Sequence, residues 1–191
     1  MSPSPESLKA AHLIERLERL ARGNELKDRL NPAQWQALRY LASANRFSRT
    51  PAALAEFMAS TRGTVSRTLT ALEANGYISR RTNQDDRRGV VLSLTAKAGK
   101  ALTRDPLLDL AGDVDRALGK AAVQLVQALG AVLSQAVERN HRRPFDLCAS
   151  CRHFRRNVRP GADQPHHCAL LDEPLSDRDS HWICVEQEPA A

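Results

Sequence analysis

The stretch Thr50–Arg81, TPAALAEFMASTRGTVSRTLTALEANGYISRR, decides the fold of this 191-residue chain. Its apolar residues predict two short helices joined by the small polar turn ASTRG. Thr50 can cap the first helix, and Pro51 fits its first position, where no backbone N–H is needed. Gly76 favours the end of the second helix, because glycine adopts the left-handed backbone at little cost. Two short helices joined by a tight turn form a helix-turn-helix.

A β-hairpin is predicted directly after these helices. An extended segment begins at Tyr77, the tetrapeptide NQDD is turn-forming, and Val90, Leu92 and Leu94 alternate with less apolar neighbours. Two strands joined by an arginine-bearing loop make a wing beside the helix-turn-helix. The expected fold class is therefore mainly α with a small β-hairpin wing, a winged helix-turn-helix.

Helical patterns flank this unit on both sides. Asn31 and Pro32 predict the start of a helix with a buried apolar stripe, and Pro106 predicts a break further along the chain. Apolar residues recur at helical spacing within 13–21 and again within 122–137. We expect the stripes within 13–21 and 122–137 to form a dimer surface. The alternative is that they pack within one chain. The predicted divisions are an N-terminal dimerisation helix (1–30), a winged helix-turn-helix domain (31–95), C-terminal dimerisation helices (96–140) and a four-cysteine metal-binding extension (141–191).

Positive charge is concentrated in the middle of the chain. The net charge is +6, but residues 141–191 hold 7 basic and 8 acidic residues, whereas residues 46–100 hold 10 basic and 4 acidic ones. A basic middle and a nearly neutral tail favour contact between the middle and a polyanion. The alternative is an ordinary solvated basic face.

Three segments resemble the MarR family of dimeric bacterial winged helix-turn-helix transcriptional regulators. They are NPAQWQALRYLA, TPAALAEFMASTRGTVSRTLTALEANGYISRR and DDRRGVVLSLTAKAGKAL, and the resemblance spans roughly residues 10–140. It implies a homodimer that binds double-stranded DNA at a pseudo-palindromic operator, usually as a repressor. It also implies a possible small aromatic effector bound in a crevice between the dimer helices and the winged part. Some relatives sense oxidants with an early cysteine, but this chain has none before Cys148.

The DNA-binding residues are predicted from the face of the second helix and from the wing. With Val65 and Leu69 pointing inward, the open face of an α-helix that fits the major groove carries arginines and hydroxyls. Arginines at the wing tip can reach phosphates or the minor groove, and Asp86 is expected to orient Arg88. The predicted DNA-binding residues are Arg62, Thr64, Ser66, Arg67, Arg87 and Arg88.

All four cysteines lie in the tail, and we predict that they bind a metal: Cys148, Cys151, Cys168 and Cys184. A two-residue gap lets the first two sulfurs reach one metal, and four thiolates complete either a zinc site or an iron–sulfur cluster. The long gaps before the third and fourth cysteines, and nearby Phe145, Phe154 and Trp182, favour an iron–sulfur cluster over Zn²⁺. The tail also resembles small iron–sulfur and zinc modules, through the pattern CxxCxxF…C…PL…C. A metal-free thiol switch is a further alternative. Nearby histidines are spare ligand candidates: His153, His166, His167 and His181.

The leading hypothesis is a MarR-type regulator whose tail senses redox state or iron and alters its packing against the last helix. The alternatives are a structural zinc tail on a regulator that responds to an aromatic ligand, and an iron–sulfur electron-transfer or protein-interaction module. No phosphate loop, nucleophile–base pair or cofactor fingerprint stands out, so we do not expect an enzyme. The N-terminus lacks a signal-peptide pattern and no uninterrupted apolar run approaches a membrane span, so we expect a cytoplasmic protein without membrane contact.

Overall fold

The computed structural model describes residues 2–190 except 24–29 and 83–88. Its helices are α1 (Pro5–Gly23), α2 (Pro32–Ser43), α3 (Pro51–Phe57), α4 (Arg62–Ala74), α5 (Ala96–Leu102), α6 (Leu107–Leu118), α7 (Ala122–Arg139) and α8 (Asp177–Ser180), with the 3-10 turns η2 (Gly119–Ala121) and η3 (Cys148–Ser150). Its strands are β1 (Ile78–Thr82), β2 (Val90–Leu94), β3 (Phe154–Arg155), β4 (His166–Cys168) and β5 (Glu173–Leu175). The fold is mainly helical with a small antiparallel hairpin, as expected.

Local capping fixes the helices of the winged unit. Asn31 and Gln34 form a reciprocal capping box at the start of α2, and Thr50 accepts a hydrogen bond from the backbone of Ala53 at the start of α3. Thr61 caps α4 in the same way. Gly76 follows α4 with φ +70°, a left-handed conformation that a β-carbon would disfavour. The predicted helix boundaries at Pro32, Pro51 and Gly76 are confirmed.

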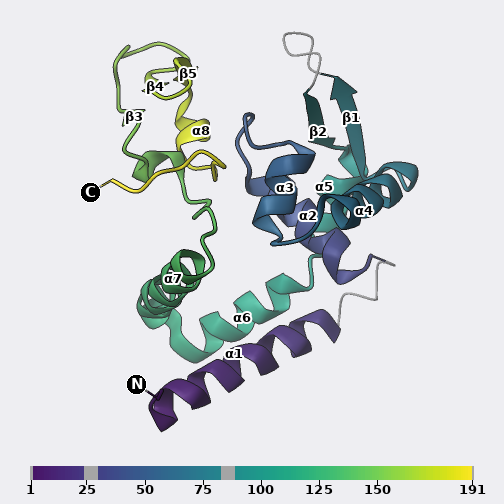
Figure 1. Ribbon diagram of the computed structural model, residues 1–191, viewed down its shortest axis with the longest axis vertical. Coiled ribbons are helices and arrows are strands. Elements are labelled where there is room, and N and C mark those ends of the chain that lie inside the picture. The colour runs from purple at the N-terminus through teal and green to yellow at the C-terminus, as the bar shows by residue number, and fades with distance from the viewer. Residues whose placement is uncertain (1, 24–29, 83–88, 191) are drawn as a thin grey trace.

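The core of the winged unit lies between α2, α3, α4 and the hairpin. Its fully buried side chains include Trp35, Leu38, Leu54, Leu69 and Leu92. β1 pairs antiparallel with β2, with Ile78 opposite Leu94 and Thr82 opposite Val90. The amide of Leu92 also donates to the carbonyl of Arg49 (2.8 Å), which fastens β2 to the segment between α2 and α3. Figure 1 shows the hairpin standing at the end of this helical unit.

Helices α1, α6 and α7 form a separate layer below the winged unit (Figure 1). The predicted break at Pro106 is confirmed, because α5 ends at Leu102 and α6 begins at Leu107. In α1 and α7 the apolar stripes are exposed: Leu13 by 52%, Val126 by 68% and Leu133 by 60%. Packing within the single chain, which was the alternative to a dimer surface, therefore leaves much of each stripe uncovered.

The stretch Ala96–Arg139 is long and apolar enough, by length and composition alone, to cross a membrane. Its most apolar 18-residue window has a mean hydropathy of 1.4, and none of that window is buried. This differs from the sequence expectation, which considered only uninterrupted apolar runs. Polar side chains follow one side of α7, at Gln124, Gln127, Ser134 and Gln135. A helix with one polar and one apolar side fits a protein interface, whereas a single spanning helix is apolar all round.

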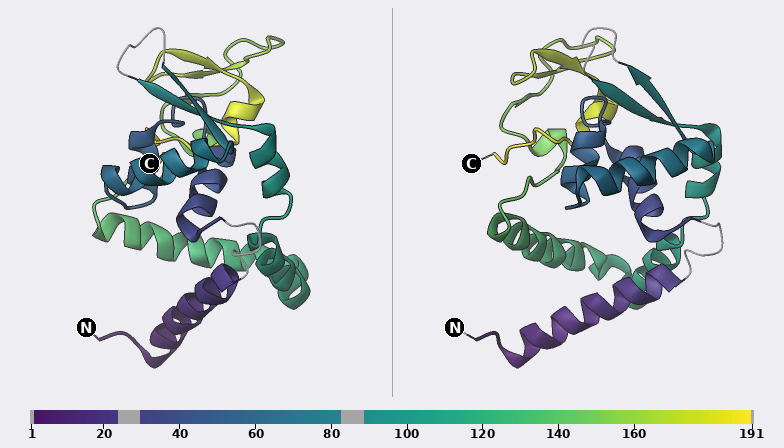
Figure 2. Two further views of the ribbon diagram at one scale, coloured as in Figure 1. Left: turned by 90° about the vertical axis from the view of Figure 1, so that its right-hand side faces the viewer. Right: turned by 45° about the vertical axis from the view of Figure 1, so that its right-hand side comes forward.

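The C-terminal residues form a small module of three short strands and α8. β4 lies between β3 and β5, antiparallel to both. All views in Figures 1 and 2 show this module at the same end of the molecule as the wing. Its backbone does not follow the expected course against the last helix, because Ile183 pairs with Ala44 in the segment after α2. Residues 44–49, which we call the α2–α3 loop, are thus the main attachment of the module.

Candidate nucleic-acid interface and cysteine site

The outer face of α4 carries the predicted DNA-binding side chains. Val65, Leu69 and Leu72 are at most 1% exposed and anchor the helix to the core. The predicted residues on the opposite face are all exposed, namely Arg62, Thr64, Ser66 and Arg67. An exposed helix face with two arginines and two short hydroxyls suits the major groove, where arginine pairs with guanine and hydroxyls approach phosphates.

The first turn of α4 is ordered by hydroxyl groups. Thr61 accepts a hydrogen bond from the amide of Thr64 (3.2 Å), and the two hydroxyls lie 2.9 Å apart. Arg62 is the first residue of α4, so the free backbone amides and the positive end of the helix dipole lie beside a cationic side chain. Thr61 was not among the predicted site residues, although threonine directly before a helix is a recognised N-cap residue.

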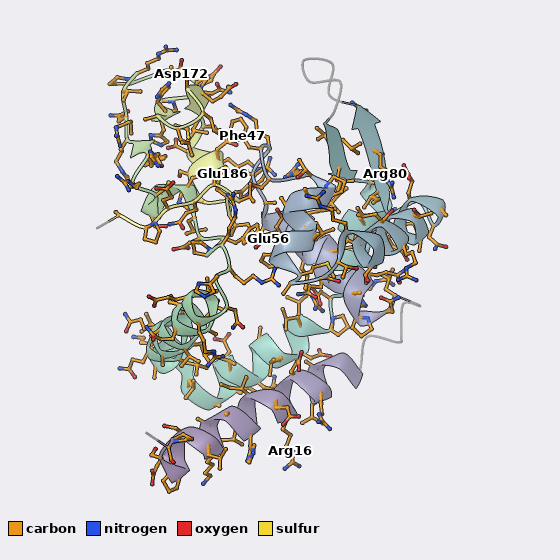
Figure 3. All side chains as sticks on the ribbon, in the orientation of Figure 1. Arg16, Phe47, Glu56, Arg80, Asp172 and Glu186 are labelled. Carbon is orange, nitrogen blue, oxygen red and sulfur yellow. The ribbon has the colours of Figure 1, made fainter. Side chains whose placement is uncertain are left out.

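Only part of the wing lies within the described residues. Asp86, Arg87 and Arg88, which the sequence predicts at the wing tip, lie outside them. On β1, Arg80 pairs with Glu73 of α4 (3.0 Å) and donates to the hydroxyl of Thr70 (3.2 Å). Figure 3 labels Arg80 where β1 meets α4. Its neighbour Arg81 is exposed, and alternation along the strand was the sequence signal that could have marked it as a wing residue.

All four cysteines line one small cavity of about 20 Å³. η3 supplies Cys148 and positions Cys151 directly after it, with the amide of Cys151 donating to the carbonyl of Cys148 (3.0 Å). Cys168 ends β4, opposite Phe154 and Glu173. The amide of Cys184 donates to the carbonyl of Asp146 (3.0 Å), which brings the last cysteine beside the first pair. Three separate segments thus converge on one point.

The surroundings of the sulfurs are apolar on one side and polar on the other. Phe154, Leu170 and Leu175 line the cavity, and Cys148 and Cys184 are each 7% exposed. The amide Nδ2 of Asn45 donates to the sulfur of Cys148 (3.2 Å). All four cysteines are free thiols, with no disulfide among them.

Cys148 and Cys184 titrate as a pair. A hydrogen bond from Cys148, which outweighs burial, lowers the pKa of Cys184 to about 6. The same hydrogen bond, followed by burial, raises the pKa of Cys148 above its ordinary value. The hydrogen bond between the two sulfurs therefore favours ionisation of the Cys184 thiol and opposes ionisation of the Cys148 thiol.

Within residues 2–23, 30–82 and 89–190, no group of three or more His, Cys, Asp or Glu side chains has the arrangement to hold one metal ion. Of the four spare histidines, only His153 lines the cavity. Two others are paired with carboxylates, His166 with Asp177 at 2.8 Å and His167 with Asp172 at 3.1 Å. The fourth, His181, contacts the backbone carbonyl of Asp177 through its ring Nδ1 (2.8 Å).

A larger apolar cavity of about 720 Å³ lies between α1, α2, α6 and α7. Leu13, Leu17 and Leu129 are among the residues that line it, and Arg39 contributes a cation. Arg39 holds Asp105 through two hydrogen bonds of 2.8 and 2.6 Å. Burial raises the pKa of Asp105, but the bonds from Arg39 and from the amide of Leu107 outweigh it and keep that pKa below its ordinary value.

Comparison with known proteins identifies the winged part. Residues 30–89 match the model of the MarR family. Comparison with curated protein sequences gives no match. The chain is similar to the reduced form of MarR from E. coli (22% identity, 69% of this chain and 98% of the other, TM-score 0.54). It is similar to the transcriptional regulator BldR from Sulfolobus solfataricus (22% identity, covering 71% of this chain and 99% of the other, TM-score 0.55). It also resembles NadR in complex with 4-hydroxyphenylacetate (23% identity, covering 70% of this chain and 94% of the other, TM-score 0.57).

These similarities define the class of the fold. The winged unit and its helical layer have the fold of MarR-type transcriptional regulators, as the sequence predicted. The matched structures are covered almost completely, whereas the remainder of this chain has no counterpart in them.

Proposed function

We propose that this protein is a DNA-binding transcriptional regulator that acts as a homodimer on a pseudo-palindromic operator. The observation that carries the proposal is the outer face of α4, where Arg62, Thr64, Ser66 and Arg67 are exposed over a buried apolar face. An α-helix of this kind enters the major groove, and the neighbouring wing would contact the adjacent backbone. We further propose that Arg87 and Arg88 contact DNA and that Asp86 orients Arg88.

The exposed apolar helices support the dimer. Leu13 of α1 and Val126 and Leu133 of α7 are each more than half exposed in the single chain. Contiguous apolar surface of this kind marks an interaction site, and a symmetric partner would cover both stripes at once. Two recognition helices held one helical turn of DNA apart then read two half-sites. We propose that occupation of a promoter by such a dimer represses transcription.

We propose that the four cysteines hold one iron–sulfur cluster. One observation supports it: all four cysteines line one cavity with an apolar wall. Four thiolates are the ligand set of such a cluster. The cluster would report redox state or iron supply to the regulator.

A second candidate is a structural zinc tail combined with a small aromatic effector. The small size of the cysteine cavity, about 20 Å³, favours a single ion. The apolar cavity of about 720 Å³ with Arg39 at its wall could take an aromatic acid, and the similar protein NadR has been crystallised in complex with one, 4-hydroxyphenylacetate. Under this candidate the effector, and not the tail, changes DNA affinity.

Two measurements on the same anaerobic preparation test these proposals. The first selects duplexes from a random library and measures their affinity between about 50 and 200 mM salt. A sequence-specific complex with a steep salt dependence of its affinity is expected. If the selection returns no duplex, the result contradicts DNA binding. The second assays iron, acid-labile sulfide and zinc together with the visible spectrum. Iron with sulfide supports the cluster, whereas one zinc per chain without colour supports the second candidate.

A further inference from the structure

The cysteine module is attached to the helix-turn-helix through the α2–α3 loop. The amide of Ile183 donates to the carbonyl of Ser43, and the amide of Asn45 donates to the carbonyl of Ile183, both at 2.9 Å. Leu147 pairs with Ile183 on the other side. The backbone just before Cys184 is therefore enclosed between the α2–α3 loop and the segment that carries Cys148.

Two buried side chains link the sulfurs to this loop. Asn45 and Ser48 are each 0% exposed. Nδ2 of Asn45 donates to the sulfur of Cys148 (3.2 Å), and its Oδ1 accepts from both the amide (3.0 Å) and the hydroxyl (2.7 Å) of Ser48. The hydroxyl of Ser48 accepts in turn from the amide of Val185 (2.8 Å), the residue after Cys184. The pair thus touches the cysteine site at both ends.

The same loop sets the position of DNA-binding elements. Thr50, two residues after Ser48, caps α3, and α3 packs against α4. The carbonyl of Ser48 accepts from the hydroxyl of Tyr40 (2.7 Å), and the carbonyl of Arg49 accepts from the amide of Leu92 in the wing (2.8 Å). A displacement of the loop therefore reaches α3 and β2 directly.

Charged contacts fix the rest of the module independently of the sulfurs. Arg46 donates to the carbonyl of Pro174 (2.6 Å) and lies near Glu173 and Asp179. Arg49 stacks over Trp182, with its guanidinium carbon 4.7 Å from the ring centre. Figure 3 labels Phe47 on the loop and Glu186 on the segment after Cys184, the two chain segments that face each other here. The module therefore stays docked while the cysteine end of the contact changes.

We propose that the Asn45–Ser48 pair transmits the loaded or empty state of the four-cysteine site to the helix-turn-helix, an inference that rests on the proposed function. A bound centre holds the four sulfurs together and keeps Cys148 against Asn45. Once the centre is lost, the backbone of Cys148 keeps its bond to the carbonyl of Trp182, but its side chain is released to turn, and the buried amide of Asn45 then loses its acceptor. Because that amide cannot turn to solvent, the loop rearranges to satisfy it and moves α3 and β2. The loaded form binds DNA more tightly than the empty form.

The test compares DNA affinity of the loaded and the chelator-stripped protein, prepared without oxygen, on a duplex selected by the protein itself. Wild type is expected to lose affinity by about 5- to 150-fold on stripping. Asn45→Ala and Ser48→Ala, with unchanged metal content, bring the ratio of the two affinities close to one. Ser43→Ala is the matched control, because Ser43 donates only to carbonyls within its own helix. For Ser43→Ala the ratio of loaded to stripped DNA affinity is expected to equal that of wild type.

Each failure has a separate signature. A metal-loaded wild type whose affinity does not change on stripping overturns the inference alone, as does a metal-loaded Ser48→Ala variant that keeps the full ratio. Absence of any metal overturns the proposed centre together with the inference, and absence of a selected duplex overturns DNA binding. If neither variant holds the centre, hydrogen exchange on wild type decides: amides of 45–50 and α3 exchange faster in the empty form, and unchanged rates overturn the inference.

Discussion

Phe145 belongs to the core of the winged unit although it lies in the predicted extension. It is 8% exposed and makes edge contacts with Phe57 and Tyr40, with ring centres 5.4 and 6.1 Å apart. Its φ is +51°, a conformation that a non-glycine residue adopts only when its surroundings hold it there. The tail therefore contributes to the stability of the domain that it was expected only to follow.

The substitution Phe145→Ala is predicted to lower the free energy of unfolding by about 3 kcal/mol. Burial of the side chain contributes about 1.5–3 kcal/mol. Two edge contacts contribute about 0.5–1.5 kcal/mol each. Partial collapse of the site around the smaller alanine recovers some of the lost free energy. Phe145→Gly is expected to cost up to about 1 kcal/mol less than Phe145→Ala, because glycine relieves the left-handed backbone.

The assay is urea unfolding followed by helical circular dichroism at one fixed protein concentration, since a dimer's stability depends on concentration. Leu147→Ala is the control, because Leu147 is 38% exposed and lies two residues further on. It should cost less than about 1 kcal/mol. Equal costs for the two alanine variants would show that Phe145 is not part of the winged core. A glycine variant less stable than the alanine variant would refute the argument from backbone conformation.

Three other substitutions test contacts elsewhere in the chain. Arg67→Ala should weaken binding to a selected duplex and, if it contacts a phosphate, reduce the slope of log affinity against log salt by about 1, as measured by fluorescence anisotropy. Asp105→Asn should cost about 1–3 kcal/mol at neutral pH in thermal or urea unfolding, because Arg39 loses a charged partner. Since the folded-state pKa of Asp105 lies below its ordinary 3.8, this contribution is complete above that pH and disappears as the pH falls below it; a cost that persisted in acid would contradict the assignment. Val126→Glu should convert the dimer to monomer in sedimentation, whereas Gln127→Glu on the polar side of α7 should not.

The sequence determined the local structure of this protein because caps and breakers act over a few residues. Pro32, Pro51 and Gly76 set helix ends through their own backbone preferences, and the structure has those ends where expected. The inward face of α4 followed from the spacing of Val65, Leu69 and Leu72, so its outer face could be named in advance. The grouping of four cysteines in one tail likewise indicated a common site.

Only the tertiary structure decided how distant segments meet. Nothing in the spacing of Cys148, Cys168 and Cys184 fixes their directions, which depend on β4, α8 and the bridge between Leu147 and Ile183. The tail was expected against the last helix, yet it pairs with the α2–α3 loop, where Asn45 had carried no sequence signal. A buried amide acquires its importance only from the partners that surround it, because in isolation it has no periodicity and no motif.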